Sequence, residues 1–208
     1  MGLATTERAA IADLFDEVGP DAPTLCEGWH TKDLAAHLVI RERRPDAGIG
    51  IVVSALAWRT RAVQDQTATK PFGELVQEVR SGPPLWNPMR LGPVGDLVNA
   101  LEFLVHHEDV RRAAPTWAPR ELSSADQDEA WAKLLGFARG AFKSSPVGVV
   151  LRRPDGRTRT VRDGASTVTL TGDPVELVLL AFGRDEHRVR IDGDPTDVTV
   201  FLATPRGI

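Results

Sequence analysis

The stretch Val94 to Ala114, VGDLVNALEFLVHHEDVRRAA, decides how the rest of the chain is interpreted. Val98, Leu101 and Val105 repeat at the spacing of three and then four residues that lines one face of a helix. Apolar residues also occupy much of the remaining surface, which is typical of a helix packed on several sides. The stretch therefore predicts a long, largely buried helix inside a helix bundle.

Two polar residues interrupt that apolar surface. Glu102 and His106 lie four residues apart, so their side chains stand one above the other on a single helix face. A carboxylate and an imidazole inside a bundle are costly unless a partner satisfies them. Two explanations stay open at this point: a hydrogen-bonded core pair, or two ligands of one metal ion.

Length and composition predict a globular protein of ordinary type. The chain has 208 residues, of which 42% are hydrophobic and 26% charged. Its formal net charge of −4 speaks against a general nucleic-acid binder. No apolar run reaches the roughly 18 residues that a membrane span needs, and no export signal is recognised. The single cysteine, Cys26, excludes an intrachain disulfide, suits the cytoplasm and is expected to be a buried small residue.

Periodicity and capping residues predict further helices on both sides of the central one. The expected helices are Leu3–Val18, a second one capped by Thr31 and running to Arg44, Ile49–Arg61, Phe72–Arg80, and one capped by Ser123 or Ser124 that runs to Phe142. His37 lies on the apolar side of the second helix. Considered alone, it is a core histidine with one hydrogen bond, but it can also supply the third member of a ligand set.

Composition changes at Ser144, where strand signals replace helical ones. Residues 147–153 and 158–162 are rich in Val, Thr and Arg and flank Pro154-Asp155-Gly156, which predicts a hairpin. A third strand at 166–171, a helix from Asp173 to Phe182 and a strand at 188–191 follow, and a second Gly-Asp-Pro at 193–195 suggests another strand-to-helix junction. The predicted fold class is therefore α+β, with a helix bundle at 1–143 and a small α+β domain at 144–208.

A metal site of catalytic type needs three protein ligands and one open position. His37, Glu102 and His106 could supply that set from two helices. Two nitrogens and one carboxylate oxygen suit zinc, and would also accept nickel, cobalt, iron or manganese.

The residues next to His106 are expected to have supporting roles. His107 points about 100° away from His106, so it is expected to pack or to face solvent. Asp109 lies three residues beyond His106 and could orient its ring. Glu108 and Arg111 are expected to be solvated helix surface. The chain contains no G-x-S-x-G and no dinucleotide or Walker glycine pattern, so these sites are not predicted.

Several of these stretches resemble a known family. TLCEGW at 24–29, DLAAHL at 33–38 and EFLVHH at 102–107 are similar to the mycothiol-dependent maleylpyruvate isomerase N-terminal family, one of the DinB-like metal-binding four-helix bundles. RERRPD at 41–46 and VHHEDVRR at 105–112 resemble a branch of that family described only as metal-binding. GDPVEL at 172–177, with Gly183-Arg184, is similar to the sterol-carrier-like domain that follows such bundles.

The resemblance implies a DinB-like up-down four-helix bundle whose metal ligands are His37, Glu102 and His106, followed by a sterol-carrier-like α+β domain. It favours a metal-dependent enzyme, most simply with Zn²⁺, that uses a thiol such as mycothiol to transfer or isomerise a small electrophilic substrate. No substrate-binding arginine or catalytic residue is matched. Two alternatives stay open. One is a non-catalytic protein that binds a metal or senses an apolar ligand, and the other is a purely structural bundle in which His37 is hydrogen-bonded to Glu102. A homodimer is also possible.

Overall fold

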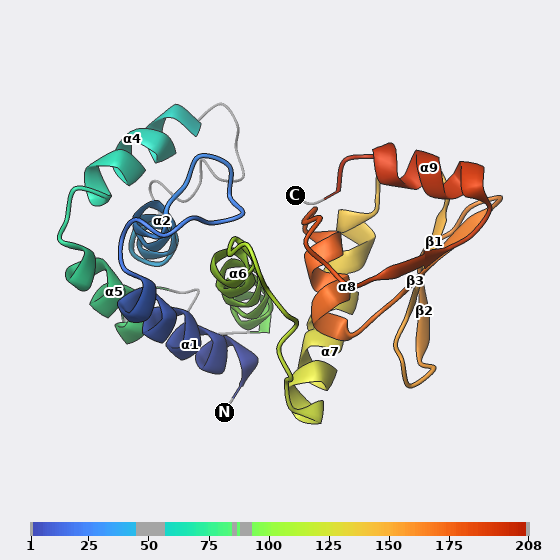
Figure 1. The fold of residues 1–208 in the computed structure, drawn as a ribbon, viewed down its shortest axis with the longest axis horizontal. Helices are drawn as coiled ribbons and strands as arrows, with labels where there is room; N and C mark the ends of the chain where they lie inside the picture. Colours follow the sequence, from blue (N-terminus) through green and yellow to red (C-terminus); the bar gives the residue numbers. More distant parts are fainter. Residues whose placement is uncertain (1, 45–56, 85–86, 88–92, 207–208) are drawn as a thin grey trace. The chain divides into compact units, whose positions relative to one another are not determined.

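A computed structural model describes residues 2–44, 57–84, 87 and 93–206. Within these residues the chain forms eight helices and one four-stranded mixed sheet, so the predicted α+β class is confirmed (Figure 1). The chain divides into two compact units, Leu3–Ala118 and Pro119–Ile208.

The first unit is helical. Its described helices are α1 (Leu3–Val18), α2 (Thr31–Arg43), α4 (Ala57–Thr67), α5 (Phe72–Ser81) and α6 (Pro93–Arg112). Four of the predicted helices are found within one or two residues of their expected ends. The helix expected at Ile49–Arg61 lies partly outside the described residues, and α4 continues beyond its expected end to Thr67.

One hydrophobic core ties α1, α2, α5 and α6 together. α1 lies against α5 and α6, and α2 lies against α4 and α5. The buried core residues are Ile11, Ala12, Phe15, Leu34, Ala35, Ala36, Leu38, Val39, Leu75, Val76, Val79, Phe103 and Val110. Burial of this apolar surface, at about 25 cal/mol per Å², is the main force that holds α2 and α6 in place.

The start of α2 differs from its prediction. Thr31 was expected to be the N-cap, but it is the first helical residue, and His30 is the N-cap. Asp33 accepts a hydrogen bond of 3.0 Å from the backbone N–H of His30. The Thr31 hydroxyl instead donates to the carbonyl oxygen of Gly19. Tertiary contact with the end of α1 therefore takes the side chain that the local sequence predicts as a cap.

The second unit holds the sheet. Its elements are α7 (Ser124–Ala141), β1 (Gly148–Arg152), β2 (Thr158–Arg162), β3 (Thr167–Thr171), α8 (Pro174–Ala181), β4 (Arg190–Asp192) and α9 (Pro195–Ala203). The strand order is β2-β1-β3-β4; β1 and β3 are parallel, and the other neighbours are antiparallel. Both Gly-Asp-Pro segments precede helices, α8 and α9, as predicted.

The position of α7 differs from the predicted division of the chain. The sequence predicts this helix as part of a bundle domain ending at residue 143, but its packing partners are α8 and β2. Its buried face carries Trp131, Leu134 and Ala138. Because that face is covered by elements of the second unit, the boundary between the two units along the chain lies between Ala118 and Pro119. Helical periodicity identifies an apolar face, but not the element that covers it.

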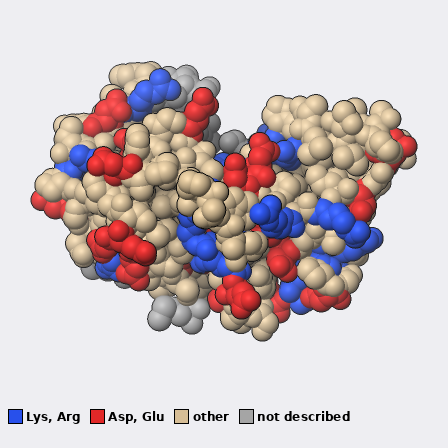
Figure 2. All heavy atoms as spheres, in the orientation of Figure 1, with Lys and Arg blue, Asp and Glu red and all other residues tan. Residues whose placement is uncertain are grey.

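The charged side chains are interspersed. On the face seen in Figure 2, acidic and basic residues alternate with neutral surface. Among the described residues, no helix combines the length and the apolar character needed to cross a bilayer.

Candidate metal centre

The predicted ligands come from two helices of the first unit. His37 lies in α2, and Glu102 and His106 lie in α6. Because an α-helix turns once in 3.6 residues, the α6 pair projects from one face. That face contacts α2 at His37. The structure therefore brings together the three side chains that sequence analysis selected.

The two histidine rings converge on one carboxylate oxygen of Glu102. Nε2 of His106 lies 3.3 Å from Oε2 of Glu102, and Nε2 of His37 lies 4.0 Å from the same oxygen. One ligand atom from each residue lies within 4.8 Å of the other two. Ligands bonded at about 2.1 Å to a tetrahedral ion are about 3.4 Å apart, so this spacing fits zinc or a similar ion. The His37–Glu102 separation is too long for a hydrogen bond.

The cluster is largely buried, and Glu102 is its most exposed member. The side chains of His37 and His106 are 14% and 11% exposed, and that of Glu102 is 22% exposed. Complete burial would close off any further ligand, whereas all three side chains keep some exposure. A fourth ligand could therefore reach the cluster.

The protonation states favour ligation at two of the three residues. Burial lowers the pKa of His37 by more than the nearby Glu102 raises it, so His37 has a free nitrogen lone pair at neutral pH. Burial tends to raise the pKa of Glu102, but His106, His37 and Arg41 together hold it well below its ordinary value. Burial likewise opposes charge on His106, but its partners Asp109, Cys26 and Glu102 raise its pKa well above normal. Only His106 must lose a proton to bind an ion.

Asp109 orients the His106 ring from the opposite side. Its Oδ2 lies 2.9 Å from Nδ1 of His106, and its carboxylate is fully buried. This contact, which the spacing predicts, places the Nδ1 proton toward Asp109 and leaves Nε2 facing Glu102. The Cys26 thiol donates to the same Oδ2 at 3.3 Å, and the backbone N–H of Leu25 donates to the Asp109 carbonyl at 3.0 Å. The loop before α2 is thus fixed to α6.

Cys26, His106 and Asp109 form a second group with metal-ligand spacing. Cys26 is half-buried rather than buried, and its Sγ lies 3.9 Å from Nδ1 of His106. Two hydrogen bonds already satisfy this group internally. Cys26 and His106 are also not arranged as a catalytic nucleophile and its base. The thiol approaches Nδ1 of His106, the same nitrogen that faces Asp109, whereas a catalytic histidine contacts the nucleophile with one ring nitrogen and the carboxylate with the other.

Arg41 and Trp29 are neighbours of the cluster that sequence analysis did not assign to it. Nε of Arg41 lies 3.6 Å from Oε2 of Glu102, and its Nη1 donates to Asn99 at 3.2 Å. The Trp29 ring packs on His37 with centroids 5.2 Å apart. Arg41 follows His37 by four residues, so the i, i+4 rule offered a signal for it. The Trp29 contact depends on the loop fold and had no such signal.

The other side of α6 holds buried polar and charged residues that form pairs but, among the described residues, no group with metal-ligand spacing. His107 is buried with its Nδ1 2.9 Å from Oε2 of Glu7, which agrees with its predicted packing role. Glu108 was expected to be solvated surface, but it is fully buried. It accepts hydrogen bonds of 3.0 Å from Arg111 and 2.5 Å from Arg112. The prediction that Glu108 faces solvent was therefore wrong, because a charged residue can be buried where oppositely charged partners pair with it.

The fold is similar to that of a known enzyme. A crystal structure of the mycothiol-dependent maleylpyruvate isomerase aligns with a TM-score of 0.60 and 15% identity, over 92% of this chain and 90% of that chain. A crystal structure of a histidine-to-alanine mutant of mycothiol-dependent maleylpyruvate isomerase aligns with a TM-score of 0.53 and 15% identity, over 92% and 91%. No family model and no curated protein matches the sequence. The predicted resemblance is thereby confirmed for the fold.

Proposed function

We propose that this chain is a metal-dependent enzyme that uses a low-molecular-weight thiol of the mycothiol type to transfer or isomerise a small electrophilic substrate. His37, Glu102 and His106 would hold one divalent ion. The observation that carries the proposal is the convergence of two imidazole nitrogens on one carboxylate oxygen, at 3.3 and 4.0 Å. Two nitrogens and one oxygen are a typical set for catalytic zinc.

Each residue of the cluster has a separate task in this proposal. His37 offers a neutral imidazole, Glu102 offers negative charge, and Asp109 holds the His106 ring in the orientation that ligation needs. A bound divalent ion lowers the pKa of a coordinated thiol, so that a thiolate nucleophile exists at neutral pH. Thiol and substrate would reach the ion through the partly exposed Glu102.

Zinc content tests the ion site. The chain and two variants are dialysed against zinc, freed of excess metal, and measured by elemental analysis. His37→Ala removes a ligand, and His30→Ala is the matched control, because His30 is 61% exposed and lies at the N-cap of the same helix. We expect about one zinc per chain for wild type and His30→Ala, and less than about a tenth of that for His37→Ala. Equal zinc in all three proteins would contradict the proposal.

Turnover tests the enzymatic part. The fold neighbour is named for mycothiol and maleylpyruvate, so these are the first thiol and substrate to assay. We expect loss of substrate that requires both the zinc-loaded protein and the thiol, and that fails with His37→Ala. A protein that binds zinc but shows no thiol-dependent turnover with any electrophile would instead support the alternative, a non-catalytic metal-binding protein.

A further inference from the structure

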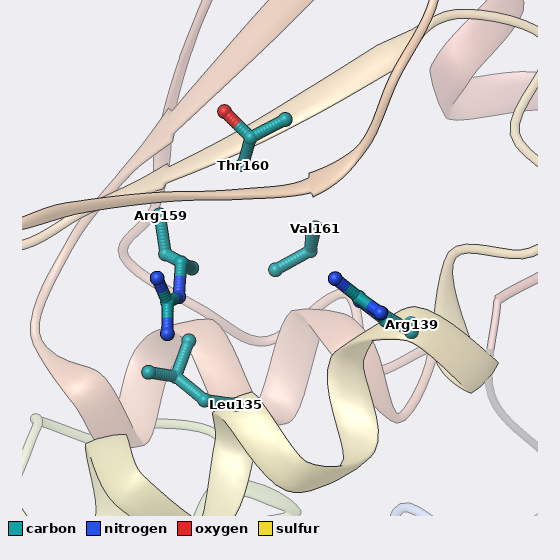
Figure 3. Close-up of a pocket in the computed structure, with 5 residues that line it drawn as sticks. All are labelled: Leu135, Arg139, Arg159, Thr160 and Val161. Carbon is teal, nitrogen blue, oxygen red and sulfur yellow. The ribbon is translucent and has the colours of Figure 1, made fainter.

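A cavity of about 370 Å³ lies in the second unit, between the last turns of α7 and the edge strand β2 (Figure 3). It is lined by Leu135, Arg139, Arg159, Thr160 and Val161. Figure 3 shows the two arginines, Leu135 and Val161 directed into the space between helix and strand, whereas Thr160 points to the other side of the strand. The proposed metal function uses none of these residues.

The two arginines of the cavity lack the carboxylates that neighbouring arginines have. Arg153 and Arg157 both donate to Oδ1 of Asp128, at 2.5 and 2.8 Å. The side chains of Arg139 and Arg159 form no hydrogen bond and no ion pair with any residue that the structure describes. The second unit thus neutralises one pair of arginines internally and leaves another pair of like charges around one cavity.

Each arginine has an ordinary explanation by itself. Arg139 lies in the last turn of α7, where the helix dipole favours a cation. Arg159 lies on an edge strand, where charge hinders pairing with another chain. Neither explanation requires both side chains to border the same cavity, nor an apolar floor beneath them. Val161 in that floor is only 8% exposed.

We propose that this cavity binds a small organic anion. Arg139 and Arg159 would engage its carboxylate through charge-assisted hydrogen bonds, and Leu135 and Val161 would contact its apolar body. Cavities that hold small ligands begin at about 300 Å³, so the volume suits a body of one or two rings. The lining residues all belong to the second unit, so this site is independent of the proposed metal centre.

The test is a titration of the ¹⁵N-labelled 208-residue chain with 1-naphthoate, followed by NMR. The protein is first stripped of metal with EDTA and then dialysed free of it, so that neither a bound metal nor the carboxylates of EDTA contribute. We expect amide shifts confined to the end of α7 and to β2. The double variant Arg139→Gln with Arg159→Gln should raise the Kd at least about tenfold, because it removes both charge-assisted contacts. Arg152→Gln is the matched control, since Arg152 is an exposed arginine of β1 outside the cavity. It should change the Kd less than about twofold.

Two further ligands separate charge from apolar contact. Neutral 1-naphthamide should bind at least about tenfold more weakly than naphthoate, and inorganic phosphate should bind weakly because it has no apolar body.

An unchanged Kd in the double variant, equal binding of the amide, or shifts located in α2 and α6 would each overturn the proposal. So would an Arg159→Gln protein that aggregates while binding naphthoate normally, because Arg159 would then only protect the strand edge. Both arginines are exposed, and preserved dispersion of the amide signals confirms that the variants are folded.

Discussion

His106 and His107 are adjacent in α6, and they belong to two clusters of different kinds. Both rings are buried, and in both Nδ1 lies 2.9 Å from a carboxylate, Asp109 for His106 and Glu7 for His107. The clusters differ at the other ring nitrogen. Nε2 of His106 meets a second carboxylate, Glu102, and lies beside His37, whereas His107 belongs to no described group with metal-ligand spacing.

This difference shows which feature separates a candidate site from a structural pair. A buried histidine with a carboxylate partner is a common way of satisfying a polar group in a core. Convergence of several ligand atoms on one point is much rarer, because like charges and desolvation oppose it. The following predictions test whether the His106 cluster binds metal while the His107 cluster supports the fold.

Removing each ring should give the largest contrast. We expect His106→Ala to abolish measurable zinc binding, because it removes a ligand. His107→Ala should keep zinc binding and lower the free energy of unfolding by about 1–3 kcal/mol, because the buried contact between His107 and Glu7 is lost. Calorimetric zinc titration and urea unfolding of both variants measure this. A His107→Ala protein that folds but loses zinc would break the distinction.

The buried ion pairs of α6 should matter for stability alone. Glu108→Ala removes the buried ion pair with Arg112, so we expect a loss of about 3–5 kcal/mol in the free energy of unfolding. Asp13→Ala is the control, because Asp13 pairs with Arg80 while 70% exposed, and it should cost less than about 1 kcal/mol. Urea unfolding at neutral pH measures both. A comparable loss in the two variants would show that burial of the pair is not decisive.

The two carboxylates that face the Nδ1 atoms should act differently. Asp109→Asn should weaken zinc binding about 10- to 100-fold, because the amide no longer holds the His106 ring as the carboxylate does. Glu7→Gln should leave the zinc affinity within about twofold, because Glu7 contacts only the neighbouring ring among these histidines. Competition with a chromophoric chelator gives both affinities. Equal weakening would remove the special role of Asp109.

The pH dependence should be a smaller effect with a defined sign. The pKa of His106 is raised, so in the metal-free protein it carries a proton at neutral pH that zinc must displace. Binding should release about one proton, and the apparent affinity should rise up to about tenfold per pH unit until His106 deprotonates. Calorimetry in buffers of different ionisation enthalpy counts this proton. No release, or release of two, would contradict these protonation states.

The same shifts predict how the metal-free protein responds to pH. His106 stabilises the fold fully below its unfolded pKa, and this contribution is lost as pH rises through the raised folded value. Glu102, whose pKa is lowered, stabilises the fold above its unfolded pKa, and its contribution is lost as pH falls. Thermal melts in EDTA, with His106→Ala and Glu102→Gln as references, separate the two contributions.

Local signals predicted most of the fold. The Val- and Thr-rich composition of β1 to β3, the Pro154-Asp155-Gly156 hairpin and both Gly-Asp-Pro helix starts depend on neighbouring residues, and the structure has them. The partner of α7 was not predictable in this way, because nothing in its own sequence specifies which element covers its apolar face. The Thr31 side chain could likewise cap its own helix or bond elsewhere, and its contact with Gly19, the residue after α1, decides between the two.

The candidate site was predicted where helical spacing determines geometry. Glu102, His106 and Asp109 are related by three or four residues within one helix, so their shared face could be derived. That His37 meets them depends on the packing of α2 against α6. The residues alone made His37 a possible third ligand, and the family resemblance then implied it. The burial of Glu108 was missed, because helical spacing predicts that Arg111 and Arg112 can pair with it but not that the group is covered by other parts of the fold.

X-ray absorption at the zinc edge, on protein loaded with one equivalent of zinc, tests the central claim most directly. His106 belongs to two groups with metal-ligand spacing, and only one of them contains sulfur. If His37, Glu102 and His106 hold the ion, the spectrum will show two imidazoles and further light atoms at about 2.0–2.2 Å, and no sulfur. A sulfur scatterer at about 2.3 Å would contradict the account, because it would place the ion at Cys26 and Asp109 instead.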